Sequence, residues 1–291
     1  MKKKILLGVI AGICGTSLAA CGGAANSGST TETTTAETTT AAGTTAAADT
    51  TSSGSTSASD VEKIKEKGTL IVGITDFEPM DYQENGEWVG FDADLAKMVA
   101  EDLGVEVKFT EIDWDNKILE LDSNSIDVVW NGMTLTDEVK KSMECTDPYL
   151  NNAQVVVVKS DKAADYKDEA SIKDLTFAVE SGSAGEAVAT EKGYKTTPVT
   201  SQADTLTEVK SGTSDAAIID SLMAGAMIGE GTNYADLTYT VSLNSEEYGI
   251  GCRKGSDLAE FINKEMKKFE EDGTLKTLAV LYGVQEALIS K

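Results

Sequence analysis

The sequence contains no histidine, a single arginine and only four cysteines in 291 residues. Without histidine, neither Ser-His-Asp nor Cys-His catalysis can be built, and the commonest zinc ligand is missing. The cysteines show neither metal-site spacing nor a CxxC redox motif. These absences argue against a hydrolase and against a metal site, and we expect the protein to use no cofactor.

Cationic residues are scarce in general. The chain has 25 Lys and Arg against 49 Asp and Glu, which gives a formal net charge of −24. Such a charge repels the phosphates of nucleic acids, so we expect no nucleic-acid partner. The acidity is typical of an exported protein that must stay soluble.

The N-terminus has the features of an export signal. Three lysines follow Met1, and an apolar stretch at residues 5–13 comes next. That stretch is too short to remain as a membrane span. Residues 18–21, Leu-Ala-Ala-Cys, resemble the lipobox of bacterial lipoproteins, in which the cysteine is acylated. We therefore expect a signal peptide at residues 1–20 and a lipid anchor at Cys21.

The next segment cannot pack into a core. Residues 22–59 are mostly Thr, Ala, Ser and Gly, a composition that buries too little apolar area to compensate for ordering. We expect residues 21–60 to form a disordered tether. The folded part then holds only Cys145 and Cys252, which could form a disulfide or remain as unpaired buried thiols.

Beyond residue 60, short apolar strands alternate with amphipathic helices. Residues 90–104 place Phe91, Leu95, Val99 and Leu103 on one helical face, with Gly104 as a stop signal. We expect strands at residues 69–74, 105–112, 126–130, 154–159, 176–179 and 216–219. Further helices are expected at residues 116–121, 183–192, 203–211, 221–228, 258–271 and 275–282. The alternation predicts an α/β fold with parallel sheets covered by helices on both faces.

Residues 125–149 contain the junction with the clearest potential for binding. After the strand we expect a tight turn at Asn131 and Gly132, and then Thr134 and Thr136 ahead of a helix that carries Glu138. Free backbone N–H groups and the dipole at such a helix start can hold a carboxylate. Taken alone, the same residues could be an ordinary strand-to-helix turn capped by Thr136.

Several sequence blocks, taken together, resemble the family-3 extracellular solute-binding proteins, which deliver amino acids to ABC importers. The resemblance covers about residues 61–283. The blocks are, in order, GTLIVGI, EWVGFDADLAKMVAEDLGV, IDWDNKILEL, SIDVVWNGMTLT, TDPYL, FAVESGSAGE, SDAAIIDS, EEYGIGCRKG and EEDGTLKTL.

The resemblance implies a two-lobed α/β fold of the type II periplasmic-binding-protein class, with a ligand cleft between the lobes and two hinge crossovers. The first lobe would contain residues 61–151 and 248–291, and the second residues 152–247. The implied function is capture of an amino acid or amine and delivery to an ABC permease. The lipobox and the long tether, with no permanent membrane span, indicate the outer face of the cytoplasmic membrane, and the alternative is a periplasm enclosed by an outer membrane. We expect a monomer that is not an enzyme.

Two other functions are compatible with the same fold. One is an enzyme similar to cyclohexadienyl dehydratase, in which Glu180 or Asp76 would be a general acid. The other is a sensor that reports ligand occupancy to a membrane receptor. Genetic neighbours, a permease and ATPase or a kinase, would distinguish the sensor from the transport protein.

The resemblance assigns ligand contacts to both lobes. From the first lobe, the implied contacts are Phe77, Trp114, Asn131, Gly132, Met133 and Thr134. From the second lobe, they are Ser181, Gly182, Ser183 and Ala184, which would close on the ligand carboxylate, and Asp220, which would pair with its ammonium group. Phe77 and Trp114 could instead be core residues, and Asp220 could simply cap the following helix.

The sequence departs from the family pattern at two ligand contacts. Val139 stands where the family usually has an arginine that binds the carboxylate, and the one arginine, Arg253, belongs to a different turn. Lys140 is adjacent to Val139 but should point elsewhere, because a helix turns about 100° per residue. Ile74 stands where the family has an acid that binds the amine, and Asp76 could substitute for it.

Glu180 occupies a position that often contacts the ligand side chain in this family. With Asp76 and Asp220 and without an arginine, the cleft would carry an excess of acidic groups. This excess leads to the hypothesis of a cationic or amine-rich ligand. The alternative is that Glu180 points into solvent.

Overall fold

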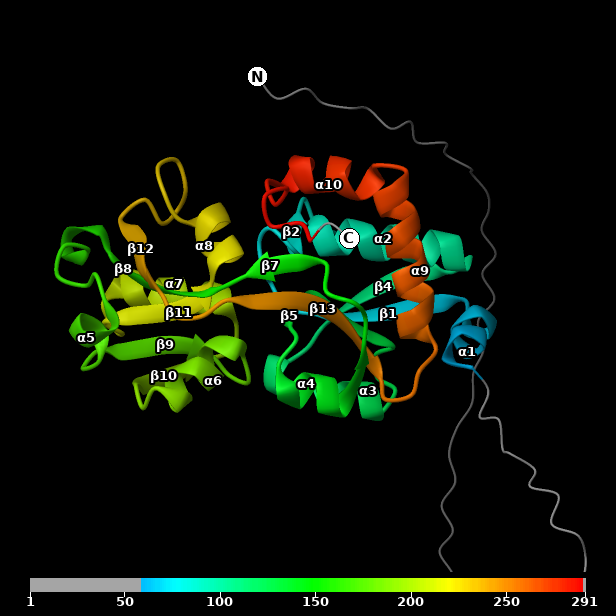
Figure 1. The fold of residues 1–291 in the computed structure, drawn as a ribbon, viewed down its shortest axis with the longest axis horizontal. Helices are drawn as coiled ribbons and strands as arrows, with labels where there is room; N and C mark the ends of the chain where they lie inside the picture. The colour runs from blue at the N-terminus through cyan, green and yellow to red at the C-terminus, as the bar shows by residue number, and fades with distance from the viewer. Residues whose placement is uncertain (1–58, 290–291) are drawn as a thin grey trace, which may run out of the picture. The chain divides into compact units, whose positions relative to one another are not determined.

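The computed structural model describes residues 59–289, and these residues form two lobes, each built on one β-sheet (Figure 1). In this range the first sheet has the strand order β4 (Glu106–Glu111), β1 (Thr69–Ile74), β5 (Val128–Thr134), β13 (Glu246–Arg253) and β6 (Met143–Cys145), and β7 (Leu150–Asn152) also pairs with β13. The second sheet has the order β10 (Lys195–Val199), β9 (Thr176–Glu180), β11 (Ala216–Asp220), β8 (Gln154–Lys159) and β12 (Leu237–Ser242). The two-lobed α/β class is confirmed.

Helices cover both faces of the first sheet. Figure 1 shows α2, α9 and α10 on one side of this sheet and α3 and α4 on the other. The helices of this lobe are α1 (Asp60–Lys67), α2 (Phe91–Leu103), α3 (Lys117–Asp122), α4 (Asp137–Ser142), α9 (Leu258–Glu271) and α10 (Thr274–Tyr282), with a 3₁₀ turn at Trp114–Asn116. A hairpin of β2 (Tyr82–Glu84) and β3 (Glu87–Val89) completes the lobe.

The second lobe is smaller and follows the same plan. Its helices are α5 (Glu169–Ile172), α6 (Ala184–Glu191), α7 (Gln202–Ser211) and α8 (Ser221–Met227), with a 3₁₀ turn at Ser160–Lys162. Its buried residues include Val156, Phe177 and Ile218 from three adjacent strands. The side chains of α5 and α6 pack against this cluster through Ile172 and Ala189.

Both sheets are mixed, so the expectation of parallel sheets is only partly correct. Strand β1 runs parallel to β4 and β5, and β9 runs parallel to β10 and β11. However, β13 is antiparallel to β5, and β8 is antiparallel to both β11 and β12. Strands β8 and β13 both begin where the chain has just crossed from the other lobe. Their direction is set by that crossover, whereas parallel neighbours are joined by a connection that contains a helix.

Helix α2 follows directly from its sequence pattern. Phe91, Leu95, Val99 and Leu103 are all buried on the face toward the first sheet. Gly104 ends the helix in the left-handed conformation, with φ of 79°. The predicted helix at residues 90–104 is therefore confirmed to within one residue at each end.

The predicted turn at Asn131 and Gly132 is wrong, because β5 continues through both residues to Thr134. Gly132 has φ of 55°, and the pairing of β5 with β13 is irregular opposite this point, between Gly249 and Gly251. A glycine with positive φ is thus accommodated inside the strand as an irregularity rather than as its end. The effect is to bring the backbone of residues 131–134 to the carboxyl edge of the sheet.

Two segments connect the lobes, and they pair with each other. The chain leaves the first lobe from β7 into β8 and returns from β12 into β13. Strand β7 is antiparallel to the start of β13, with Asn152 opposite Glu246 and Leu150 opposite Tyr248. The predicted lobe boundaries fall in this ribbon and remain a prediction.

Several predictions concern parts of the chain outside residues 59–289. The signal peptide, the lipid anchor at Cys21 and nearly all of the tether belong to this group. Within the described range, Cys145 and Cys252 are both free thiols, on the adjacent strands β6 and β13. This corresponds to the unpaired alternative rather than the disulfide.

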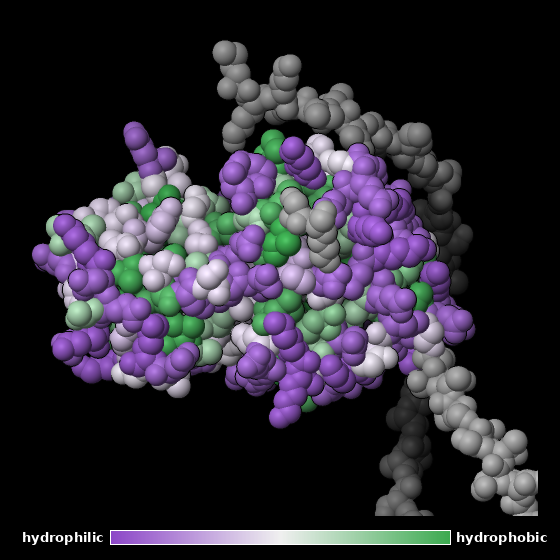
Figure 2. Space-filling model, in the orientation of Figure 1, coloured by the Kyte–Doolittle hydropathy of each residue, from purple (hydrophilic) through white to green (hydrophobic). Residues whose placement is uncertain are grey.

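The surface of the described part is largely hydrophilic. Figure 2 shows hydrophilic side chains over most of the visible face, with apolar side chains in smaller areas. Among residues 59–289, the exposed large hydrophobic side chains are Leu119, Tyr239, Val280 and Leu281. The helices in this range are all too short or too polar to cross a membrane.

Replacing Gly132 with alanine should destabilise the protein. A β-carbon there would lie 2.6 Å from Cε1 of Phe77, and the left-handed backbone adds strain. We expect the free energy of unfolding, measured in urea, to fall by roughly 2–5 kcal/mol. The matched control is Gly225→Ala in α8, where a β-carbon meets open space and helix propensity rises by up to about 1 kcal/mol. Equal loss of stability in both variants would contradict this assignment.

Candidate functional site

A cavity of about 270 Å³ lies between the lobes at the ends of β5, β9 and β11. Ligands of α/β proteins bind beyond the carboxyl ends of strands, so the position is suited to binding. Every predicted ligand-binding residue except Asp76 and Ser181 lines this cavity. The lining also includes Lys117, Ile118, Thr136, Asp137, Glu138, Val139, Ala187 and Gln202. Of these, the sequence pattern indicates only Val139 as a ligand position.

Asp76 and Ser181 are the two predicted residues that the structure does not place in the cavity. Asp76 follows the end of β1 and is exposed, whereas the next residue, Phe77, turns inward. Asp76 thus lies outside the cavity lining, and its role in place of the acid absent at Ile74 stays a prediction. Ser181 lines a separate shallow hollow beside Trp114.

Asn131 lines the cavity, but its side chain supports the wall. The amide oxygen accepts hydrogen bonds from the Thr75 backbone N–H at 2.9 Å and the Thr75 hydroxyl at 2.8 Å. The amide nitrogen donates to the Thr75 carbonyl oxygen at 3.0 Å and to the Asp81 carboxylate at 2.8 Å. Its hydrogen-bonding groups are thus occupied by β1 and the following loop, which leaves the backbone of β5 to face a ligand.

Asp92 holds the same segment from behind. Its Oδ2 accepts from the Gly132 backbone N–H at 2.6 Å, and both of its oxygens accept from the Tyr149 hydroxyl, at 2.8 and 2.9 Å. Burial raises the pKa of Asp92, and burial together with the Asp92 carboxylate raises the pKa of Asp81 well above its usual range. The Gly132 N–H is therefore used inside the protein and is not available to a ligand.

Asp220 ends β11 and enters the cavity from the second lobe. It occupies the N-cap position of α8, but within the described chain its side chain makes no capping hydrogen bond. Its carboxylate instead accepts from the Gln154 side chain at 3.0 Å, the Tyr248 hydroxyl at 2.7 Å, and the side chains of Asn152 and Gln202. Simple helix capping does not account for this side chain.

Two of the donors to Asp220 also donate to a second carboxylate, Glu246. The Asn152 and Gln154 side-chain nitrogens donate to Glu246 Oε1 at 2.7 and 2.8 Å. Asn152, Glu246 and Tyr248 belong to the paired crossover strands, and Gln154 begins β8. Burial and the nearby Glu246 carboxylate raise the pKa of Asp220. The acid at the cavity is therefore directly connected to the segments that join the lobes.

Thr134 presents an acceptor rather than a donor to the cavity. Its hydroxyl donates to Glu246 Oε1 at 2.8 Å. A hydroxyl has one hydrogen and two lone pairs, so the oxygen of Thr134 keeps only acceptor capacity. Such an oxygen suits an N–H group of a ligand.

Glu180 is buried, not solvent-exposed, so the solvent-pointing alternative is wrong. Only 2% of the residue is exposed, and its Oε1 has no hydrogen-bond partner among the described residues. Burial, followed by the Asp220 carboxylate, raises the pKa of Glu180 to about 8. An unpartnered buried carboxylate oxygen at a cavity wall is suited to a cationic ligand group.

Lys117 is the one lysine or arginine of residues 59–289 that lines the cavity. Its ammonium donates to the backbone oxygens of Trp114 at 3.1 Å and Gly182 at 2.9 Å, and it lies 5.0 Å from the centroid of the Trp114 ring. Burial lowers the pKa of Lys117, and the nearby carboxylates, with Glu180 first, oppose that shift. Because Gly182 belongs to the second lobe, this side chain bridges the cleft.

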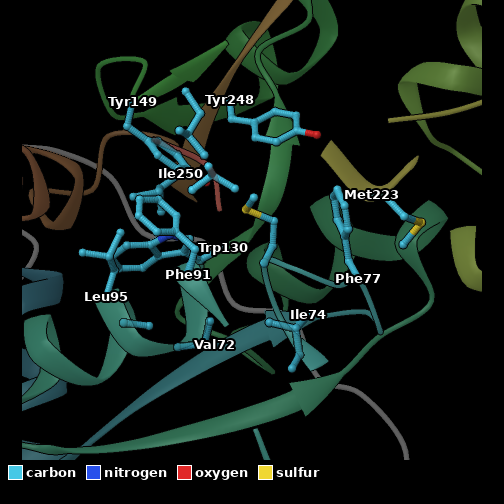
Figure 3. Close-up of a cluster of buried hydrophobic side chains, with 14 of the residues drawn as sticks. Val72, Ile74, Phe77, Phe91, Leu95, Trp130, Tyr149, Met223, Tyr248 and Ile250 are labelled. Atoms are coloured by element: carbon cyan, nitrogen blue, oxygen red, sulfur yellow. The ribbon is translucent and has the colours of Figure 1, made fainter. Parts of the chain in front are cut away.

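Two aromatic rings flank the cavity. Phe77 is buried and meets Tyr248 edge to face, with centroids 6.3 Å apart, and Figure 3 shows its ring beside Met223 of α8. Trp114 is buried against the α3 and α4 side of the first sheet. Both rings therefore belong to the hydrophobic core and to the cavity wall. Core packing and ligand contact, the two alternatives for these residues, do not exclude each other.

The second lobe closes the cavity with the start of α6. The Ser183 hydroxyl caps this helix by accepting from the Glu186 N–H at 3.1 Å, and Glu186 Oε2 accepts from the Gly182 N–H at 2.7 Å. Gly182 has φ of 73°, and a β-carbon there would lie 2.7 Å from the Asp115 Cα. Glycine thus lets the backbones of the two lobes meet at this edge.

Arg253 is occupied elsewhere. Its guanidinium pairs with Asp60 at 3.1 Å and Asp127 at 3.5 Å and donates to the Ile126 carbonyl oxygen at 2.8 Å. Val139, at the position where the family usually has arginine, is buried in the cavity wall. The cavity therefore offers acceptors and carboxylates in excess over cationic donors, and its chemistry favours binding of a cation.

Comparisons with known proteins agree with this geometry. Residues 70–285 match the sequence family described as bacterial extracellular solute-binding proteins, family 3. Over 222 residues the chain is 33% identical to the arginine-binding extracellular protein ArtP of Bacillus subtilis, and the match covers 73% of this chain and 85% of ArtP.

Solved structures show the same similarity. A mutant of ArgBP from T. maritima is 36% identical with a TM-score of 0.72, covering 77% of this chain and 98% of that one. The ancestral amino acid-binding protein AncCDT-1, described as a precursor of cyclohexadienyl dehydratase, is 33% identical with a TM-score of 0.70, covering 77% and 99%.

Glu180 should make the ligand-free protein less stable as pH rises. Its raised pKa means that Glu180 binds a proton more tightly in the folded state than in the unfolded state. The stabilisation of the folded state by this proton is complete below about pH 4.5 and is lost as the pH rises through about 8. Relative to the wild type, Glu180→Gln should gain on the order of 2–4 kcal/mol in free energy of unfolding between about pH 5 and pH 9.

Urea denaturation at several pH values measures this difference. Glu191→Gln is a matched control, because Glu191 ends α6 in the same lobe and is exposed. As a substitution on the exposed surface, it should change the free energy of unfolding by no more than about 0.5 kcal/mol. A Glu180→Gln difference that is equally small would contradict the burial of an unpartnered acid.

Proposed function

Since the chain belongs to the bacterial extracellular solute-binding proteins of family 3, we propose that it captures a cationic amino acid outside the cell for an ABC importer. The observation that carries the proposal is the acidic cavity. Glu180 and Asp220 both line it, and Glu180 has a carboxylate oxygen without a partner among residues 59–289. A ligand with two cationic groups would satisfy both acids.

The two acids have different tasks in this proposal. Asp220, fixed by its neutral donors, pairs with the α-ammonium group, and the Thr134 oxygen accepts from the same group. Glu180 pairs with the cationic end of the ligand side chain, whose stem lies between Phe77 and Trp114. ArtP of Bacillus subtilis is described as an arginine-binding extracellular protein, which is consistent with such a ligand.

The remaining parts of the chain fit delivery to a membrane permease. Residues 1–20 would direct export, the Cys21 lipid would anchor the protein at the outer face of the cytoplasmic membrane, and residues 21–60 would act as a tether. Closure of the two lobes around the ligand would then give the permease a ligand-bound form to recognise. No chemical step is required of the protein.

A dehydratase is the second candidate, because a buried acid with a pKa of about 8 can act as a general acid. The similarity to AncCDT-1 supports testing it. Incubation with prephenate or arogenate, followed by absorbance of an aromatic product, distinguishes the two candidates. We expect no turnover.

Calorimetry with arginine and its neutral analogue citrulline tests the role of Glu180. The wild type should prefer arginine, because only arginine carries a cation for the unpartnered carboxylate. Glu180→Gln should reduce the affinity for arginine by roughly ten- to hundredfold and leave citrulline nearly unchanged. Glu191→Gln should preserve the preference.

The same titrations decide the ligand class. Asp220→Asn should weaken both amino acids by roughly ten- to hundredfold, since both carry the α-ammonium group. Tight binding of glutamate or aspartate, with none of arginine, lysine or ornithine, would refute the cationic ligand.

Replacing Cys21 with serine tests the anchor. The variant should leave the membrane fraction and lose incorporation of labelled fatty acid, because the acylated side chain is gone. Cys14→Ser, which lies within the predicted signal peptide, should still be labelled. Labelling that survives in Cys21→Ser would place the lipid elsewhere.

A further inference from the structure

The proposed ligand carries a carboxylate, and the cavity offers few groups to bind it. Val139 has no donor side chain, and Arg253 is paired with Asp60 and Asp127 away from the cavity. Lys140 is exposed and lines a neighbouring hollow instead. The donors must therefore come from another part of the wall.

Lys117 has the position and an unused N–H donor to bind the ligand carboxylate. It lies at the start of α3, is only 8% exposed, and faces the cavity. An ammonium group has three N–H donors, and two of them are directed at the backbone oxygens of Trp114 and Gly182. The third is left for a ligand.

The hydrogen bond to Gly182 also brings the ammonium to the start of α6. Ser183 and Ala184 follow Gly182 directly, and the N-terminus of a helix favours an anion. The Ser183 hydroxyl accepts from the Glu186 N–H, so its own hydrogen remains available as a donor. The ammonium, the hydroxyl and the helix start thus converge from two lobes.

Glu180 completes the arrangement. Among the charged groups near Lys117, the Glu180 carboxylate has the largest electrostatic effect on it. No ion pair joins Glu180 and Lys117 within residues 59–289, and Glu180 Oε1 has no hydrogen-bond partner there. A cationic amino acid could supply an opposite charge to both groups, with its side-chain cation on Glu180 and its carboxylate on Lys117.

We propose that Lys117 is a specificity-determining residue that binds the carboxylate of the ligand, together with Ser183 and the first turn of α6. This inference rests on the proposed binding of a cationic amino acid. Lys117 would then be the cation of the first lobe in this site. The sequence did not indicate it, because Lys117 lies one helical turn after Trp114 and far along the chain from Val139, where the family usually has its arginine.

The test compares arginine with agmatine, which is arginine without its carboxylate. Calorimetry of the wild type should show tighter binding of arginine. In Lys117→Met, which keeps an unbranched side chain one atom shorter and removes the ammonium, the affinity for arginine should fall by roughly ten- to hundredfold while that for agmatine is unchanged. Lys117→Arg should restore the preference for arginine, and Lys140→Met should leave it intact.

Each other result has a definite meaning. Equal loss of arginine and agmatine in Lys117→Met would overturn the inference, because Lys117 would then only fasten the lobes through Gly182. Unchanged binding of both would overturn it as well. If the wild type binds neither arginine nor lysine, the proposed function itself fails, and this outcome is visible before any variant is made. Thermal unfolding of Lys117→Met confirms that the variant is folded.

Discussion

The hydrogen bonds around Asp220 connect the cavity with the joint between the lobes. Asn152 and Gln154 each donate to Asp220 and to Glu246, and Tyr248 donates to Asp220 from β13. All these donors are neutral amides or a hydroxyl, so the two carboxylates are fixed in place without being neutralised by a cation. An acid held in this way keeps its capacity to pair with a cationic ligand. Asp220 is therefore connected by hydrogen bonds to both strands that join the lobes.

The first lobe uses the same principle behind its ligand-facing strand. Asp92 and Asn131 are buried, and their polar groups bond to Gly132, Tyr149, Thr75 and Asp81. These side chains position the backbone of β5, whereas the sequence pattern suggested that Asn131 contacts the ligand itself. The cavity wall is thus held by polar side chains whose hydrogen bonds are made within the protein.

Much of the fold follows from local signals, and the site follows only in part. The spacing of Phe91, Leu95, Val99 and Leu103 determines α2, and the apolar run of β5 marks a buried strand. Local periodicity could not give the direction of β13, since that depends on a crossover more than a hundred residues after β5. Gln202 and Lys117 carried no usable signal either, because each reaches the cavity through tertiary packing. The exposure of Asp76 was equally invisible, since it depends on which of two adjacent side chains turns inward.

The acidic cavity links ligand capture to protons. Burial makes Glu180 hold its proton up to a pKa of about 8, so at neutral pH the empty cavity is largely uncharged at this residue. A cationic group placed beside Glu180 favours the ionised form, and binding must then release the proton. Lys117 opposes full protonation even in the empty state, because its ammonium lowers the pKa of the same carboxyl. For a cationic ligand, the affinity therefore rises with pH below about pH 8. The slope depends on how far the Lys117 ammonium lowers the pKa of Glu180.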